Sequence, residues 1–261
     1  MSGARWAGLA GDHHVHSTFS DDAASTLAEN VAAARAVGLT YLRLVDHVRA
    51  STTWVPEFLA AVDAVVDADS GQPGTLTVRT GLEAKILNSA GLLDLPPGLR
   101  TGPGGVDRVL IADHQYPSPQ GPWSPSRVLA ERAAGLTAAT VLDTLIVATI
   151  RAMGSAQHAQ LAHPFSLLPK VGLTEHDLHE DHLAALASAA AATGTWVEVN
   201  EKWGCPGIRV IHAMLDAGVT LVASTDSHHR RDVGRYRLVA ELTEGLREQR
   251  RPPADRCGPL R

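Results

Sequence analysis

The feature that most constrains the fold of this chain is an alternation of strand-like and helix-like segments. Segments typical of strands lie at residues 9–16, which open on the short apolar run Leu9-Ala10, and at 41–45, 76–82, 106–112, 157–162, 196–200 and 219–223. Segments with helical spacing of apolar residues lie between them, at 27–37, 58–66, 138–153, 180–193, 208–217 and 239–247. Strands alternating with helices predict a parallel sheet, and about seven strands suit a closed or nearly closed α/β barrel better than two domains.

Local signals support the helix boundaries. Thr26 with Glu29 forms a capping-box pattern at the start of the first helix. Gly38 and Gly194 are well placed to end the helices before them. No linker divides the chain, so we expect one domain over residues 1–248, a surface flap over 115–126 that contains four prolines, and a disordered tail over 249–261.

The composition bounds the class of protein. The formal charge of −5 gives no general attraction to nucleic acid or to an anionic membrane. Two distant cysteines exclude a disulfide framework and a cysteine-rich zinc module. The amino terminus lacks the apolar core of a signal peptide, and no apolar run approaches membrane-spanning length. We therefore expect a cytoplasmic protein.

A histidine pair follows the first short apolar run, in Asp12-His13-His14-Val15-His16-Ser17. Side chains two apart on a strand point to the same face, so His14 and His16 are expected to emerge together, with His13 packed on the other side. Histidine is the commonest metal ligand. The pair alone is weak evidence, and it gains meaning only if further ligands follow other strands.

Residues of the ligand type end nearly every predicted strand. They are His14, His16, Asp21 or Asp22, His47, Glu83, His114, His163, Glu198 with Asn200, and Asp226 with His228. The carboxyl ends of all strands of a parallel barrel meet on one face. Imidazole and carboxylate ligands in this mixture suit Zn²⁺, Mn²⁺ or Fe²⁺. The set exceeds what one ion needs, which predicts two or three divalent metal ions.

These segments resemble the successive motifs of the PHP (polymerase and histidinol phosphatase) family. The resemblance spans about residues 9–235, in the family's order, and is carried by Asp12–His16 with Ser20-Asp21, Val45–His47, Gly81–Glu83, Ala112–His114, Ala162–Pro164, Glu198–Asn200 and Ser224–His228. Glu83 to Asn88 with Gly91 and Asp94 looks closest to the family's small stand-alone trinuclear-zinc phosphoesterases. The resemblance implies a distorted seven-stranded (β/α) barrel of the TIM-like type and a two- or three-metal phosphoesterase site.

The resemblance also implies a role for each motif residue. His14, His16 and Asp226 would hold one metal, and Glu83 would bridge it to a second one held by His114 and His163. A third would take His47, His228 and an acid of the first motif. Family members differ at that acid, and between the two adjacent aspartates Asp21 is favoured over Asp22.

The expected activity is hydrolysis of a phosphoric monoester on a small phosphorylated metabolite. Clustered divalent ions neutralise the charge of the phosphoryl oxygens and favour a bridging hydroxide as the nucleophile. Glu83, Asp226 and His228 are the expected catalytic residues. Arg49, Lys85 and Arg230 lie just beyond motif residues and are candidates to bind the phosphate.

Three other functions stay open at this stage. One is a histidinol-phosphate phosphatase specifically, although no substrate-selecting residue can be identified. Another is a metal-dependent amidohydrolase, because two-metal barrels also hydrolyse amides. The third is a non-catalytic metal-binding module, against which the complete ligand set argues. Neither nucleic acid nor a membrane is expected as a partner, and the sequence does not select an oligomeric state.

Overall fold

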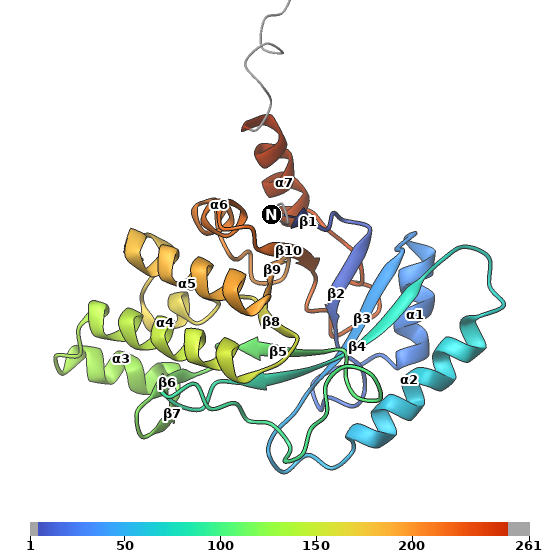
Figure 1. Cartoon of the computed structure of the whole chain (residues 1–261), viewed down its shortest axis with the longest axis horizontal. Helices are drawn as coiled ribbons and strands as arrows, with labels where there is room; N and C mark the ends of the chain where they lie inside the picture. Colours follow the sequence, from blue (N-terminus) through green and yellow to red (C-terminus); the bar gives the residue numbers. More distant parts are fainter. Residues whose placement is uncertain (1–4, 250–261) are drawn as a thin grey trace, which may run out of the picture.

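The computed structural model describes residues 5–249, and its main strands form a nearly closed parallel barrel (Figure 1). The strands are β1 Arg5–Trp6, β2 Gly11–Val15, β3 Tyr41–His47, β4 Thr77–Lys85, β5 Arg108–Ala112, β8 Ala159–Ala162, β9 Trp196–Asn200 and β10 Thr220–Ser224. Their order is β1-β10-β9-β8-β5-β4-β3-β2, and every pair is parallel. The short β1 was not predicted. The other seven strands confirm the predicted TIM-like barrel.

The barrel closes where β2 meets the end of β10. The backbone N–H of His16 donates to the carbonyl of Ser227 at 2.8 Å, and Val15 forms a bridge with Ser227. This contact joins the first and the last motif of the chain. Histidines near the amino terminus therefore lie beside acidic residues some 200 positions later.

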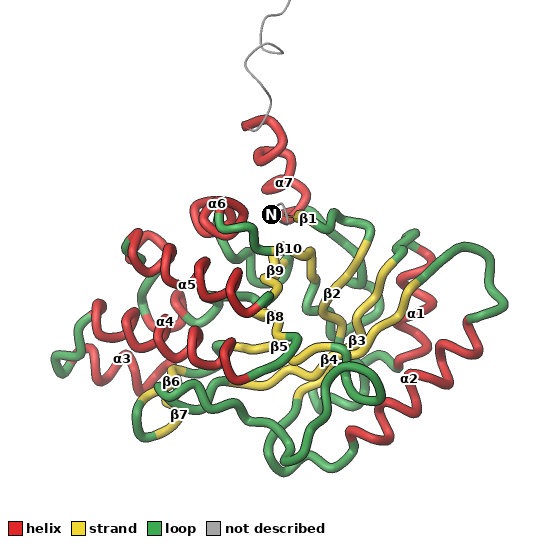
Figure 2. Tube along the Cα trace, viewed as in Figure 1, coloured by secondary structure: helices red, strands yellow, loops and turns green. Residues whose placement is uncertain are grey.

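Helices cover the outside of the barrel (Figure 2). They are α1 Leu27–Ala36, α2 Val55–Asp69, α3 Pro125–Ala133, α4 Ala138–Ser155, α5 Glu180–Thr193, α6 Ile208–Asp216 and α7 Leu238–Gln249, with 3-10 turns η1 Leu168–Val171 and η2 Glu175–Asp177. The capping box of Thr26 and Glu29 is present, and Gly194 caps α5 in the left-handed conformation. The predicted tail begins at Gln249, which is the last residue of α7; residues 250–261 lie outside the described residues.

The predicted flap over 115–126 is more ordered than expected. It contains an antiparallel hairpin of β6 Tyr116–Ser118 and β7 Gly121–Trp123, followed directly by α3. Pro117 pairs with Pro122 across the hairpin, where neither residue has an N–H to donate. Those prolines made the segment resemble an irregular loop, and α3 was missed with it.

A β-bulge changes the direction of side chains in β2. The register with β3 shifts between Asp12 and Val15, so strict alternation fails there. His13 stacks on Tyr41 inside the barrel, with ring centroids 4.3 Å apart, while His14 also faces the barrel interior. His13 is packed, as expected, but inside the barrel rather than on the opposite face.

Helix α4 differs from the expectation that no apolar run approaches membrane-spanning length. Its 18 residues have a mean hydropathy of 1.3, which by length and composition alone is sufficient for a membrane span. The helix packs against α5 and β6, and its face with Leu142, Leu145 and Met153 is buried in the core. These contacts are those of a core helix in the layer outside the barrel.

Candidate metal centre

Glu83 on β4 lies at the centre of the site, with 2% of its surface exposed. Five imidazoles surround its carboxylate. Oε2 lies 3.5 Å from His14 Nε2, 3.4 Å from His16 Nε2 and 2.8 Å from His47 Nδ1, and Oε1 lies 3.1 Å from His114 Nε2 and 3.0 Å from His163 Nε2. The two oxygens thus face two different groups of imidazoles. This is the arrangement that a carboxylate bridging two ions requires.

Asp226 completes a group with the histidine pair of β2. Its Oδ1 lies 3.1 Å from His16 Nε2 and 3.7 Å from His14 Nε2, and the two Nε2 atoms are 2.9 Å apart. Oδ2 of Asp226 instead accepts the indole N–H of Trp203 at 2.7 Å and lies 3.1 Å from Lys202 Nζ. One carboxylate oxygen of Asp226 therefore stays directed at the imidazoles.

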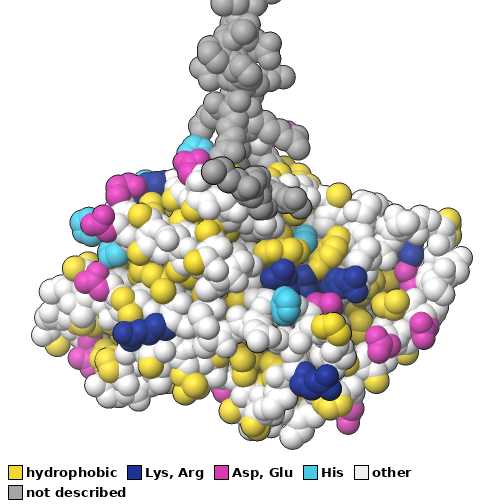
Figure 3. Space-filling model, in the orientation of Figure 1, with side chains coloured by type: hydrophobic (Ala, Val, Ile, Leu, Met, Phe, Trp, Pro, Cys, Tyr) yellow, Lys and Arg dark blue, Asp and Glu magenta, His cyan; other side chains and the backbone are white. Residues whose placement is uncertain are grey.

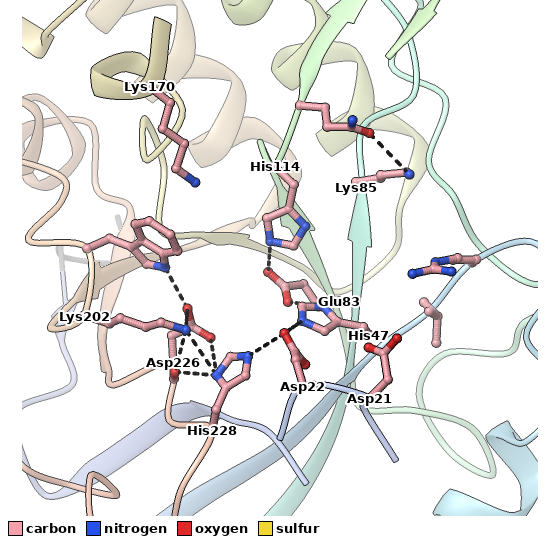
Figure 4. A pocket seen from close by; sticks show the side chains of 14 residues that line it. Asp21, Asp22, His47, Glu83, Lys85, His114, Lys170, Lys202, Asp226 and His228 are labelled. Atoms are coloured by element: carbon pink, nitrogen blue, oxygen red, sulfur yellow. Dashed lines mark hydrogen bonds and ion pairs between the residues drawn. The ribbon is translucent and has the colours of Figure 1, made fainter. Parts of the chain in front are cut away.

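Asp22 is the acidic residue of the first motif that contacts the histidines (Figure 4). Its Oδ2 lies 3.2 Å from His228 Nε2 and 3.6 Å from His47 Nε2. Asp21 lines the same cavity, but within residues 5–249 no ion pair joins its carboxylate to an imidazole. The geometry thus favours Asp22 over Asp21 as the acid beside His47 and His228.

A buried carboxylate fixes the orientation of His14. Glu198 on β9 lies 3.0 Å from His14 Nδ1, and it also accepts hydrogen bonds from Gln160 Nε2 at 2.7 Å and Ser224 Oγ at 2.9 Å. A carboxylate only accepts, so Nδ1 of His14 carries the proton. The lone pair of a neutral His14 is then on Nε2, which points at the centre of the cluster.

Serine hydroxyls fix His16 and His163 in the same way. Ser20 Oγ donates to Asp46 Oδ1 at 2.6 Å, so it must accept from His16 Nδ1, 3.3 Å away. Ser166 Oγ donates to Asp113 at 2.9 Å and accepts from His163 Nδ1 at 3.0 Å. In their neutral form, both imidazoles therefore carry the ring proton on Nδ1 and present the lone pair of Nε2 to the centre.

Three buried imidazoles of the centre, those of His14, His16 and His163, have raised pKa values and favour the protonated form. Burial alone lowers the pKa of His16, but the nearby carboxylates of Asp226 and Glu83 raise that pKa to about 9. For His163, burial is likewise outweighed by Asp113 and Glu83, which raise its pKa to about 10.

The pKa values of the carboxylates Glu83 and Asp226 shift in the opposite direction. Burial raises the pKa of Glu83, but the nearby imidazoles, His114 and His14 foremost, hold it well below its usual range. The pKa of Asp226 is lowered in the same way by His14 and His16 against the effect of burial. The cluster is thus built of ionised acids around sites that bind a proton or another cation.

The donor set fits divalent metal ions. Oε2 of Glu83 is buried and has no hydrogen-bond partner, which is costly unless a cation compensates it. Nε2 of His14 and Nε2 of His16 lie 2.9 Å apart, close enough for one cation to contact both. Three overlapping groups bring ligand atoms within 4.8 Å of one another: His14 with His16 and Asp226; His16 with His47 and His228; and His47 with Glu83 and His114.

Two ligand-type residues at strand ends have backbone conformations that side chains rarely adopt. Asp226 has φ of +50° and His163 has φ of +28°. A non-glycine residue in this region is strained, and such strain persists where surrounding contacts hold it. Hydrogen bonds to Trp203 and Ser166 hold these two side chains in place.

A cavity of about 400 Å³ opens onto the centre. Of the three cations proposed from sequence to bind substrate, Arg49 and Lys85 line it. Arg230 does not; it lies on the surface, where it pairs with Glu29 at 2.7 Å. Two cations that the sequence did not suggest, Lys170 and Lys202, also line the cavity. Lys170 lies in the short 3-10 turn η1 and Lys202 in the turn after β9, where no periodic pattern indicates them.

One known protein is similar to the chain in sequence and another in fold. No protein-family model matches the chain. A probable phosphatase of Vibrio parahaemolyticus is 26% identical over 239 residues, which cover 90% of this chain and 84% of that protein. The crystal structure of histidinol phosphate phosphatase from Lactococcus lactis, complexed with zinc, L-histidinol and phosphate, is similar with a TM-score of 0.62 and 16% identity, covering 92% of each chain.

Proposed function

Because the chain resembles the PHP family in its motifs and in its barrel, we propose that it is a metal-dependent phosphatase that hydrolyses a small phosphorylated metabolite. The observation that carries this proposal is Glu83, a buried carboxylate among five imidazoles with one oxygen lacking a hydrogen-bond partner. Both similar proteins are phosphatases, one of them named as probable, which supports the choice of a phosphoric ester.

Three groups of residues would hold two or three divalent ions, with zinc the first candidate. They are His14, His16 and Asp226; His114 and His163; and His47, His228 and Asp22, with Glu83 shared between groups. When bound, such ions supply Lewis acidity: they lower the pKa of coordinated water and neutralise phosphoryl oxygens. We assign the third acid to Asp22 rather than Asp21, because the carboxylate of Asp22 lies within ion-pair distance of His228 and His47.

The chain's own cations would bind the phosphoryl oxygens. Lys202 Nζ lies 3.1 Å from Asp226 Oδ2 and 3.2 Å from His228 Nδ1, so its ammonium is at the edge of the ligand cluster. Lys170 Nζ lies 4.0 Å from the ring centroid of Trp203, on the same side. Two ammonium groups here can donate hydrogen bonds to a phosphate that faces the centre. They take the role that the sequence assigned to Arg230.

Glu83, Asp226 and His228 act mainly by holding the ligand geometry. Trp203 and Lys202 keep Oδ2 of Asp226 occupied, which leaves Oδ1 for the centre. The backbone carbonyl of Asp226 accepts from Nδ1 of His228 at 2.9 Å, which leaves its Nε2 facing Asp22. The side chains are therefore oriented before any ligand binds, as efficient catalysis requires.

Hydrolysis of p-nitrophenyl phosphate after metal removal and restoration tests the proposal. We expect turnover that is lost after chelation and returns with Zn²⁺, Mn²⁺ or Fe²⁺. Glu83→Gln keeps the size of the side chain but removes the charge, and should lower kcat/KM by at least about 10³-fold, the scale of losing an essential group in a catalytic unit.

The matched control is Glu57→Gln on the exposed face of α2, which should retain wild-type turnover. A metabolite panel should contain amides and cyclic amides beside phosphate esters, with histidinol phosphate among the esters. Hydrolysis of amides without any phosphate ester would overturn the proposal in favour of an amidohydrolase. Absence of both activities in metal-loaded protein would favour a binding module.

A further inference from the structure

The cavity above the centre is lined by an excess of cations. When the candidate ligands are set aside, its charged lining consists of one acid, Asp21, and four cations, Arg49, Lys85, Lys170 and Lys202. This excess is local, because the whole chain carries a net charge of −5. On the face seen in Figure 3, Lys and Arg side chains occur in small, separate groups among apolar and acidic ones. The cavity therefore differs in charge from the protein as a whole.

The four cations form two pairs on opposite sides of the cavity. Arg49 follows β3 and Lys85 ends β4, and these strands are neighbours in the sheet. Lys170 and Lys202 follow β8 and β9, which are also neighbours. Strand β5 lies between the two pairs and carries His114 at its end. Figure 4 shows Lys85 on one side of His114 and Glu83, and Lys170 with Lys202 on the other.

Asp94 holds the Arg49–Lys85 side in place. It is mostly buried, its Oδ1 accepts the backbone N–H of Ala50 at 2.7 Å, and its Oδ2 lies 3.7 Å from Lys85 Nζ. The turn after Arg49 is fixed further, because Thr52 Oγ1 accepts the N–H of Arg49 at 2.9 Å. Asp94 thus connects the turn after Arg49 to the side chain of Lys85.

One phosphate group does not account for both pairs. Lys170 and Lys202 lie on the side of Asp226 and are sufficient for the scissile phosphate beside the metal ligands. On the other side, Asp94 partly compensates Lys85, whereas Arg49 has no ion pair in the part of the chain that the structure describes. A guanidinium can bind a carboxylate or phosphate group through two parallel hydrogen bonds.

We propose that the substrate carries, beside the scissile phosphate, a second anionic group on its leaving portion, and that Arg49 and Lys85 bind it. This inference rests on the proposed function, because it takes the metal centre as the site of the scissile phosphate. The second group is a carboxylate or another phosphate, since both match the two cations. A leaving portion with an ammonium group is disfavoured, because both sides of the cavity would repel it.

This expectation separates the chain from its structural neighbour. L-histidinol, bound in that protein, is an amino alcohol and carries a positive charge near neutral pH. Within a shared barrel, the loops after the strands set the substrate. The excess of cations here therefore predicts a different substrate class on the same fold.

Binding of three unreactive phosphonates to the metal-loaded protein tests the proposal by calorimetry. They are 3-phosphonopropionate, propylphosphonate and 2-aminoethylphosphonate, which place an anionic, a neutral or a cationic group at a similar distance from the phosphonate. We expect the first to bind at least about tenfold more tightly than the second, the scale of one hydrogen bond to a charged group, and the third to bind most weakly. The preference should decrease as salt increases. A bisphosphonate of similar length distinguishes a second phosphate from a carboxylate.

Variants distinguish binding of the second anionic group by Arg49 and Lys85 from its binding by the metal ions, because metal ions also attract carboxylates. Arg49→Met and Lys85→Met should bring the ratio of the first two dissociation constants toward one. Arg79→Met removes an exposed cation earlier in β4 and should leave the ratio unchanged. Equal binding of the three ligands, or a ratio insensitive to Arg49→Met, would overturn the proposal. If p-nitrophenyl phosphate is not hydrolysed while this preference holds, only the proposed reaction fails and the anionic subsite stands.

Discussion

Replacing Glu198 by glutamine should weaken metal binding without touching a ligand. The carboxylate of Glu198 accepts hydrogen bonds along both oxygens, from His14 and Gln160 at Oε1 and from Ser224 and the backbone of His163 at Oε2. An amide has only one accepting oxygen. The new NH₂ group must therefore face donors on one side.

The effect of Glu198→Gln on metal binding depends on how the new amide is oriented. The backbone N–H of His163 cannot turn away, so the amide oxygen of the new side chain should take that side and its NH₂ group should face His14. Gln160 can adapt by rotating its amide, because its Oε1 has no partner now, although the rotation gives up the hydrogen bond from its Nε2 to the carbonyl of His13. His14 can accept only by moving its proton from Nδ1 to Nε2, the atom that faces the centre. That proton must then be displaced by the metal.

We expect the affinity for metal to fall by about 10- to 100-fold, the usual effect of losing a residue that orients a ligand. Competition with a chelating zinc indicator measures this affinity, and kcat/KM should recover as free metal increases. The matched control is Glu175→Gln, where the partly buried carboxylate accepts the N–H of Gly207 and an amide oxygen can do the same. Unchanged metal affinity in Glu198→Gln, within about twofold of wild type, would refute the assigned proton position of His14.

Three further outcomes are expected. Asp22→Asn should lower the metal content by about one ion per chain while Asp21→Asn leaves it unchanged, as measured by elemental analysis; the reverse result would restore Asp21 as the ligand. In metal-free protein, the raised pKa values of His16 (about 9) and His163 (about 10) contribute stability that is complete below the unfolded-state pKa of about 6.5 and is lost as pH rises through 9 to 10. Urea unfolding at pH 6.5, 8 and 9.5 should therefore show a decreasing free energy of unfolding, and no decrease would contradict the assigned shifts. Arg230→Met should leave kcat/KM within about twofold of wild type, because this exposed side chain pairs with Glu29 away from the cavity.

The sequence was sufficient to predict the barrel and most of the cluster. The period of the apolar residues identified the strands, and the shared direction of parallel strands implied that Glu83, His114 and His163 would meet. The structure brings these three together within about 3 Å, with Glu83 Oε1 3.1 Å from His114 Nε2 and 3.0 Å from His163 Nε2. Residues far apart in the sequence come close here because they end parallel strands of the same barrel.

Features that depend on local backbone geometry were not predictable. The bulge in β2 lets the adjacent His13 and His14 both face the barrel interior, and alternation gives no sign of it. The choice between Asp21 and Asp22 depends on one turn of the loop after β2. Lys170 and Lys202 reach the cavity from segments without periodicity, so only their folded positions reveal them.

Elemental analysis of the purified chain tests the central claim most directly. After expression with sufficient zinc, manganese and iron, we expect two or three divalent ions per chain in the wild type and fewer in Glu83→Gln. Fewer than one ion per chain in correctly folded wild-type protein would contradict the metal centre and, with it, the proposed phosphatase.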